Sequence, residues 1–284
     1  MRLPQSFPQQ LMCSVVILMT LNTLGGCAIW DAKDEQTVTA KSPLKQVAPH
    51  FDAIELQVFY VERPIDDPLL GNSLWAELDQ VSTLDPVVLT ALRRNGFRFG
   101  VAGSDPPPNL QAALGMTGRT RSRTDDPDYQ LSGHTHYLRS GQEQMTNTWP
   151  IYQLCQIELD EGGEQELATY ESAQCVFRVT PERLQDGWVR VEFVPEVHYG
   201  ENKMRHQAGD HQFELRPSQL IDPFYDQRFS VELNVGELVV LSAGGDNPES
   251  LGHHFFRGGN SGSKMQRLLI VKVADMKRLD PVYE

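Results

Sequence analysis

Histidine is the residue type in this sequence best suited to hold a metal ion, because a neutral imidazole nitrogen is a common ligand of zinc and other transition metals. His134 and His136 are two residues apart, so they would point to the same side of an extended strand. His198 is the best further candidate for a third ligand. The spacings match no compact metal motif, and scattered histidines in turn-rich segments are commonly surface residues. We therefore expect no metal and no other cofactor.

A serine in a glycine-rich segment is the second candidate for chemistry. Residues 259–263 read Gly-Asn-Ser-Gly-Ser and are similar to the nucleophile segment of chymotrypsin-fold serine proteases, in which the serine lies beside an oxyanion hole. That resemblance implies a histidine base held by an acid, and no histidine here lies in a segment like that of the family. We interpret residues 259–263 as a turn, since Gly, Asn and Ser favour turns.

The carboxylates indicate no acid–base pair. Glu192, Glu196 and Glu201 fall in or beside one strand-like run, and Glu192 and Glu196 share one of its faces. A solvated face of a β-sheet explains them without catalysis. The sequence also contains no Walker loop, no dinucleotide fingerprint and no Cys-x-x-Cys pair. We expect no catalytic residue, and the alternative is a periplasmic hydrolase or metal-dependent enzyme whose residues meet only in the fold.

One of the four cysteines lies at the end of a signal-like segment. Cys27 follows Leu24-Gly25-Gly26, which closes an uncharged apolar run that is too short to span a membrane and is typical of a signal peptide. This segment resembles the lipobox of bacterial lipoproteins. The resemblance implies cleavage before Cys27, acylation of Cys27 and, because Ala28 rather than Asp follows, the periplasmic face of the outer membrane. The alternative is an ordinary secretory signal with a chance cysteine.

Cys155 and Cys175 would both remain after cleavage, and outside the cytoplasm two such cysteines can form a disulfide. They lie in two strand-like runs separated by Gly162-Gly163. If the turn centres on these glycines, Cys155 lies opposite a residue near Tyr170 and not opposite Cys175. A bulge or a longer loop would then be needed to join the sulfurs. A disulfide and two buried free thiols are the two alternatives.

The composition is that of a globular protein, with 40% hydrophobic residues. The net charge of −13, without a cluster of Lys or Arg, gives no electrostatic reason to bind nucleic acid or anionic lipid head groups. We expect the acyl chains to hold the protein to the membrane, since each buried methylene contributes roughly 0.8 kcal/mol. Residues 1–26 are then the signal peptide, and residues 27–50 are the lipidated N-terminus and a polar, flexible tether.

The remaining chain divides into two patterned regions with a polar segment between them. Residues 51–116 alternate between strand and helix patterns and predict a small α/β module. Residues 117–147 are polar and predict a linker or a long excursion. Residues 148–284 contain recurring strand-like runs between glycine- and proline-rich turns, which predict a β-rich domain. The expected fold class is α+β, a small α/β module followed by a larger, mostly antiparallel β domain.

Within the first region, several local signals predict individual elements. Asp85 followed by Pro86 is typical of a helix start, and Asn95-Gly96 is typical of a helix end. Leu70, Leu74, Leu78 and Val81 have helical spacing. Strands are predicted at 54–60 and 97–101, and a third short helix is predicted between Pro108 and Gly115.

The C-terminal third carries a partial family resemblance. It runs from Pro195-Glu196-Val197 through a hairpin at Gly236-Glu237 and the segment Leu251-Gly252 to a hydrophobic strand at 268–271. This order resembles the secretin domain of the outer membrane, whose members form inter-subunit β contacts. The chain as a whole also resembles bacterial envelope lipoproteins. These resemblances imply a lipid-anchored periplasmic protein that acts, without catalysis, by association with envelope proteins or with itself.

Overall fold

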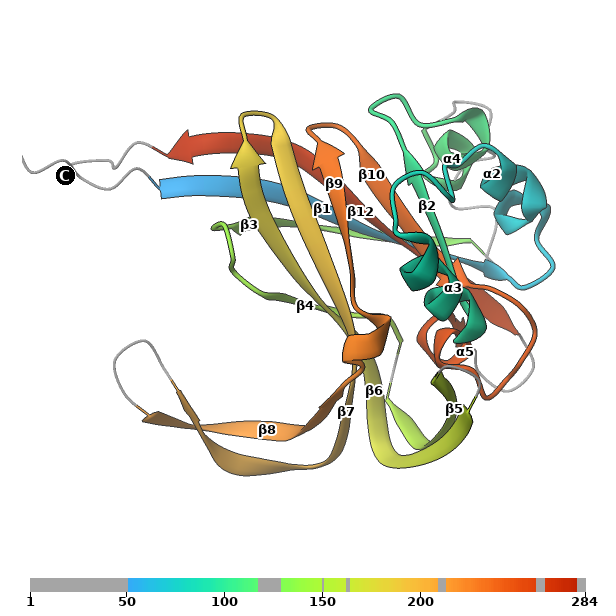
Figure 1. The fold of residues 1–284 in the computed structure, drawn as a ribbon, viewed down its shortest axis with the longest axis vertical. Coiled ribbons are helices and arrows are strands. Elements are labelled where there is room, and N and C mark those ends of the chain that lie inside the picture. Colours follow the sequence, from blue (N-terminus) through green and yellow to red (C-terminus); the bar gives the residue numbers. More distant parts are fainter. Residues whose placement is uncertain are drawn as a thin grey trace, which may run out of the picture. The chain divides into compact units, whose positions relative to one another are not determined.

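The chain forms two antiparallel β-sheets in the computed structural model, which describes residues 51–116, 129–149, 151–161, 164–208, 213–258 and 264–279 (Figure 1). The expectations for the signal peptide, for Cys27 and the tether, and for the serine segment at 259–263 lie outside these residues. The mostly antiparallel β character expected from the sequence is confirmed.

The first sheet, which we call sheet A, has the strand order β2-β10-β12-β1-β3, with the short β11 beside β12. The longest pairing joins the two ends of the described chain, because β1 pairs with β12 from Phe51–Leu279 to Pro64–Met265. The strands of sheet A are β1 (Phe51–Pro64), β2 (Phe97–Ala102), β3 (Gln130–Leu138), β10 (Leu238–Ala243), β11 (Arg257–Gly258) and β12 (Met265–Leu279).

The second sheet, sheet B, is built on one long hairpin formed by β6 and β7. The shorter strands β4 and β5 pair with β6, and β8 and β9 pair with β7. The strands of sheet B are β4 (Gln144–Asn147), β5 (Tyr152–Glu161), β6 (Glu164–Gln185), β7 (Trp188–Ala208), β8 (Phe213–Pro223) and β9 (Phe229–Asn234).

Short helices connect the strands: η2 (Pro68–Leu70), α2 (Asn72–Ala76), α3 (Pro86–Arg94), α4 (Pro108–Ala113), η3 (Tyr225–Gln227) and α5 (Leu251–Phe256). The predicted boundaries of α3 are confirmed, because the Asp85 side chain accepts from the amide of Val87 and Gly96 has φ 78°. Among the described residues, no helix has the length and apolar character needed to cross a membrane.

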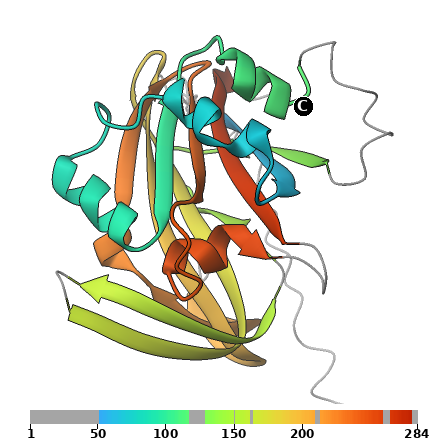
Figure 2. The same ribbon diagram turned by 90° about the vertical axis from the view of Figure 1, so that its right-hand side faces the viewer.

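Strands β1, β10 and β12 of sheet A are buried on both faces, and because side chains alternate along a strand, successive residues enter two different cores. In β10, Val239 and Leu241 face a core shared with sheet B, and Leu238 and Val240 face a second core under the helices. The second core contains Leu74 and Trp75 of α2 and its neighbours, and Figure 2 shows α2 (blue) and α4 (green) in front of the strands. The layers are therefore helices, sheet A and sheet B.

This arrangement corrects the predicted division into an α/β module and a separate β domain. Strands β1 and β2, from residues 51–116, belong to the same sheet as β10 and β12. The region 117–147 is not a linker throughout, because it contains β3 and β4. The helical stripe expected up to Val81 ends early, since α2 stops at Ala76 and Asp79 pairs with Val101 of β2. Long-range strand pairing overrides these local patterns.

Sheet B divides at one end into two hairpins that diverge (Figure 1). Strands β6 and β7 are paired only between Gln185–Trp188 and Gln174–His198. Beyond this point, β6 pairs with β5 and β7 pairs with β8. Ser172 has φ 50° at the division, and the side-chain amide of Gln219 donates to the carbonyls of Ser172 and Gly200, each at 2.9 Å. One side chain therefore satisfies two carbonyls that the diverging strands leave unpaired.

Candidate functional site

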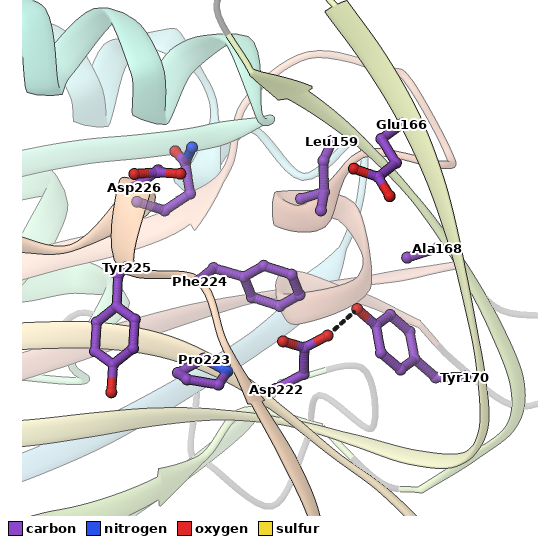
Figure 3. Close-up of a pocket in the computed structure, with 10 residues that line it drawn as sticks. Leu159, Glu166, Ala168, Tyr170, Asp222, Pro223, Phe224, Tyr225 and Asp226 are labelled. Atoms are coloured by element: carbon purple, nitrogen blue, oxygen red, sulfur yellow. Dashed lines mark hydrogen bonds between the residues drawn. The ribbon is translucent and has the colours of Figure 1, made fainter.

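A cleft of about 320 Å³ lies where the two hairpins of sheet B diverge. One wall comes from the β5–β6 hairpin, and the other comes from the end of β8 and from η3, as Figure 3 shows. The lining residues are Leu159, Glu166, Ala168, Tyr170, Asp222, Pro223, Phe224, Tyr225, Asp226 and Gln227. The volume falls at the lower end of the range for small-molecule sites.

Two side chains connect the walls across the cleft. The Tyr170 hydroxyl donates to Asp222 Oδ2 at 2.6 Å (Figure 3). Burial raises the pKa of Tyr170, and the hydrogen bond to Asp222 raises it further, so the phenol stays protonated at neutral pH. Tyr170 also packs edge-on against Tyr199, with ring centroids 5.1 Å apart. The position of the Asp222 carboxylate is therefore fixed by a buried donor.

The other wall is held by the backbone of β7. The amide of Phe224 donates to the carbonyl of Pro195 at 2.9 Å. The amide of Gln227 donates to the carbonyl of Phe224, where the chain turns from η3 toward β9. Phe224 is 8% exposed, whereas Tyr225 is 57% exposed. The sequence analysis did not identify this site, although two aspartates around Pro-Phe-Tyr form an unusual acidic and aromatic segment.

The charged side chains of the described cleft lining are all carboxylates. Glu166, Asp222 and Asp226 provide carboxylates, and no Lys, Arg or His belongs to the described lining. Gln227 is 4% exposed, and its Oε1 has no hydrogen-bond partner in the described part of the protein. This oxygen is a buried acceptor that is unsatisfied among the described residues.

A second group of reactive side chains lies beneath the cleft. Strand β5 pairs with β6 so that Cys155 is opposite Tyr170, as the position of Gly162-Gly163 predicts. Cys155 nevertheless lies close enough to Cys175 and to His254 of α5 for both to affect its pKa. The bend of β6 at Ser172, between Tyr170 and Cys175, accounts for this approach.

The pKa values of the two thiols are shifted in opposite directions. The hydrogen bond from Cys175 lowers the pKa of Cys155 against the effect of burial, and His254 lowers it further. Burial raises the pKa of Cys175. Both are free thiols here, and the disulfide between them stays a prediction. Cys155 is 1% exposed and Cys175 is fully buried, so a substrate has no access to a Cys155–His254 nucleophile.

Glu196 corrects the interpretation of the carboxylates. Glu196 is 2% exposed and does not lie on a solvated face. Its Oε1 accepts from Arg178 Nε at 2.6 Å, and its Oε2 lies 3.0 Å from Nε2 of His198. Burial raises the pKa of Glu196, but the hydrogen bonds from His198 and Arg178 outweigh it and keep the pKa below the ordinary value of 4.5. Glu192 is half-buried and lies outside this network.

The histidines considered as metal ligands are not brought together. His134 and His136 share one face of β3, with ring centroids 6.5 Å apart, and His198 is bonded to Glu196 in sheet B. Within the described ranges, no three His, Cys, Asp or Glu side chains are grouped so that they could hold a metal ion.

Strand β3 provides an uncovered edge in sheet A. It pairs with β1 on one side, and no strand of the described residues pairs with its other side. Its nine residues, Gln130–Leu138, contain no charge and no proline. Three other edges are protected, since Asp79 covers part of β2, Pro217 in β8 has no backbone N–H to donate, and β5 carries Glu158 and Asp160. The described edge of β3 is therefore suited to pair with a further strand.

Comparisons with known proteins give only remote similarity. No protein-family model matches the chain, and no curated protein matches it. Solved structures that align with it include secretins. The type II secretin GspD of enteropathogenic Escherichia coli is 12% identical (TM-score 0.25), over 96% of this chain and 75% of that chain. The type IV competence pilus secretin PilQ of V. cholerae is 13% identical (TM-score 0.24), over 79% of this chain and 61% of that chain.

A third example is the InvG secretin domain from the Salmonella SPI-1 injectisome, which is 12% identical with a TM-score of 0.22, over 83% of this chain and 65% of that chain. TM-scores of 0.22 to 0.25 do not establish a shared fold. The proposals below therefore rest on the geometry of this chain.

Proposed function

We propose that this chain is a lipid-anchored protein of the periplasmic face of the outer membrane, and that it acts by self-association without catalysis. The lipobox-like segment at Cys27 supports the anchor. The observation that carries the association is the edge of β3 from Ser132 to Leu138, with which no second described strand pairs, because an exposed strand edge presents its backbone groups to another strand. The partner we propose is a second copy of the chain.

The sequence of β3 favours pairing with itself. An antiparallel pair centred on His134 places Leu131 of each copy opposite Tyr137 of the second copy, on one face of the strand. Tyr137 is 61% exposed in the single chain, so this pairing covers an exposed aromatic ring. The strand carries no acidic or basic residue besides His134 and His136, so two copies approach at neutral pH without charge repulsion between the strands.

The first prediction tests this register by cross-linking in the envelope. In the full chain, His134→Cys places two thiols directly opposite each other, and a short thiol-specific cross-linker should give a covalent dimer. Ser132→Cys is the matched control, because two such sites would lie roughly 13 Å apart along the strands. Mixing Ser132→Cys and His136→Cys chains should restore cross-linking, since these two positions are opposite each other. The readout is the dimer band on a denaturing gel.

The association through β3 is contradicted if folded His134→Cys protein gives no dimer. It is equally contradicted if Ser132→Cys alone cross-links as well as His134→Cys does, because the strands would then not pair in this register.

The second prediction tests the anchor. Cys27→Ser removes the sulfur that would carry the diacylglyceryl group, so the variant should incorporate no labelled fatty acid and should be soluble or uncleaved. The measurement is the incorporation of labelled palmitate into the purified protein, with wild type as the comparison. Equal labelling of the two proteins would show that Cys27 is not the lipidation site.

A further inference from the structure

We propose that two paired β3 strands bind one divalent transition-metal ion through three histidines, namely His134 and His136 of one copy and His134 of the second copy. The inference rests on the β3 pairing proposed above and adds a ligand to that contact. Imidazole nitrogen is a ligand that suits zinc, copper and nickel. A single chain supplies only two of the three imidazoles, so the site is complete only when two copies meet.

The two histidines of one chain lie side by side at the margin of a core. Their rings share one face of β3, with centroids 6.5 Å apart. On that face they lie opposite Leu56 and Val58 of β1, which belong to the core shared with sheet B. His136 is half-buried, whereas His134 is exposed. The outer ring is therefore accessible to an approaching copy.

The nitrogens of these two rings are not used inside the chain. Among the described residues, no hydrogen bond or ion pair engages His134 or His136, whose ring contact is with each other. By contrast, His198 and His254 are hydrogen-bonded within the chain. Burial lowers the pKa of His136, and His134 lowers it further, so this ring is neutral at pH 7. A metal can therefore bind here without breaking an existing interaction.

The register of the pair brings the third imidazole within reach. When the pair is centred on His134, the two His134 side chains are directly opposite, with Cβ atoms roughly 4.5–5.5 Å apart. His136 lies opposite Ser132 of the second copy, about 7 Å further along the strands. These four positions form a rectangle on one face. An ion above its centre is about 4 Å from each Cβ in projection, a span that an imidazole ring and a metal–nitrogen bond of about 2.1 Å cover.

The same geometry fixes the number of ions. Ser132 of the second copy occupies the fourth corner, which leaves the fourth position of a tetrahedral ion to water or to this hydroxyl. The twofold axis of the pair generates an equivalent set of ligands, but both sets use the same two His134 rings. A dimer therefore holds one ion. Because the single chain has fewer ligands, it binds the ion more weakly, and the metal stabilises the dimer.

The test uses the full chain in detergent, stripped of metal with a chelator and then titrated with Zn²⁺. Sedimentation measures the dissociation constant of the dimer, and elemental mass spectrometry after gel filtration measures bound zinc. We expect one zinc per two chains, and at saturating zinc we expect the dissociation constant of the dimer to fall about tenfold or more. Mg²⁺ at the same concentration should have no effect, because it prefers oxygen ligands.

Two variants of β3 assign the ligands. His136→Asn removes one imidazole and keeps a neutral polar side chain, so it should dimerise without zinc as wild type does and should lose the response to zinc. Thr135→Asn is the matched control, since this exposed residue lies on the opposite face of the same strand. It should keep both the zinc-free dimer and the tenfold response.

The outcomes separate the metal site from the pairing itself. A zinc-free dimer that neither binds zinc nor tightens with it overturns the metal site and leaves the β3 pairing standing. A His136→Asn variant that responds to zinc as strongly as Thr135→Asn also overturns the site. Protein that stays monomeric at every zinc concentration overturns the pairing and, with it, the metal site. One zinc bound per chain without a change in dimerisation overturns the shared site as well.

Discussion

Replacing Arg178 by methionine is expected to lower the free energy of unfolding by about 3–5 kcal/mol, because the substitution leaves the carboxylate of Glu196 buried without its main cation. Glu196 has a side chain only 3% exposed, and Arg178 Nε contacts it at 2.6 Å. Arg178 also bonds to Glu143 at 2.7 Å, so one guanidinium serves two carboxylates. The measurement is urea unfolding of residues 51–284 at pH 7.

Arg190→Met is the matched control for this experiment. Arg190 also contacts two carboxylates, those of Glu182 and Glu232, but on an exposed surface where ion pairs contribute little. We therefore expect a much smaller loss in Arg190→Met. Equal losses in the two variants would show that burial of the Arg178–Glu196 pair does not matter.

The pH dependence gives this prediction a second signature. In wild type the pKa of Glu196 is below its ordinary value of 4.5, so its contribution to stability is present above that pH and is lost on further acidification. Without Arg178, burial becomes the dominant effect and raises this pKa. The Arg178→Met variant should consequently recover stability relative to wild type as the pH falls from 7 to 5, when Glu196 takes up a proton.

Gly252→Ala is expected to cause a comparably large loss, about 3 kcal/mol or more, because there is no space for a methyl group. A Cβ at this position would lie 1.9 Å from the carbonyl oxygen of Gly96, and the neighbouring atoms are also backbone. The amide of Gly252 donates to the carbonyl of Asn95 at 2.8 Å, so α5 rests directly on the turn between α3 and β2.

Displacement of α5 would also disturb the aromatic core. Phe255 of α5 packs against Phe97 and Phe177, with ring centroids 5.5 and 4.9 Å apart. Thermal unfolding followed by near-ultraviolet circular dichroism measures both effects. Gly103→Ala is the control, since no atom lies within 4 Å of its Cβ position and the residue is exposed. A Gly252→Ala protein as stable as Gly103→Ala would contradict the close packing.

Local features of the fold could be predicted from the sequence because their causes are local. Asp85 and Gly96 mark the ends of α3 by capping and by left-handed backbone conformation. The position of the glycine pair after β5 predicts the strand register in which Cys155 lies opposite Tyr170, and this register is confirmed. The alternation of Val189, Val191 and Phe193 indicated a half-buried strand, which is part of β7.

Features that depend on distant contacts could not be predicted in this way. Strand β3 is largely exposed and polar, so it lacks the apolar alternation that reveals a strand. Glu196 was predicted on a solvated face, because the sequence of β7 alone does not indicate that Arg178 of the neighbouring strand β6 pairs with it. The cleft needs the positive φ of Ser172, and serine gives no sequence signal for that conformation. Tyr170 and Asp222 meet across a cleft that forms only where the two hairpins diverge.

The pairing of β1 with β12 determines when folding can finish. Lys277 contacts Glu55 across 222 positions of the sequence, so β1 is the first strand of sheet A along the chain and its neighbour β12 is the last. Contacts of such high sequence separation slow folding, since a long loop must close before they form. Until residues 265–279 pair with it, β1 presents an unpaired apolar edge that can aggregate. A chaperone that holds β1 would therefore protect the chain until β12 is in place.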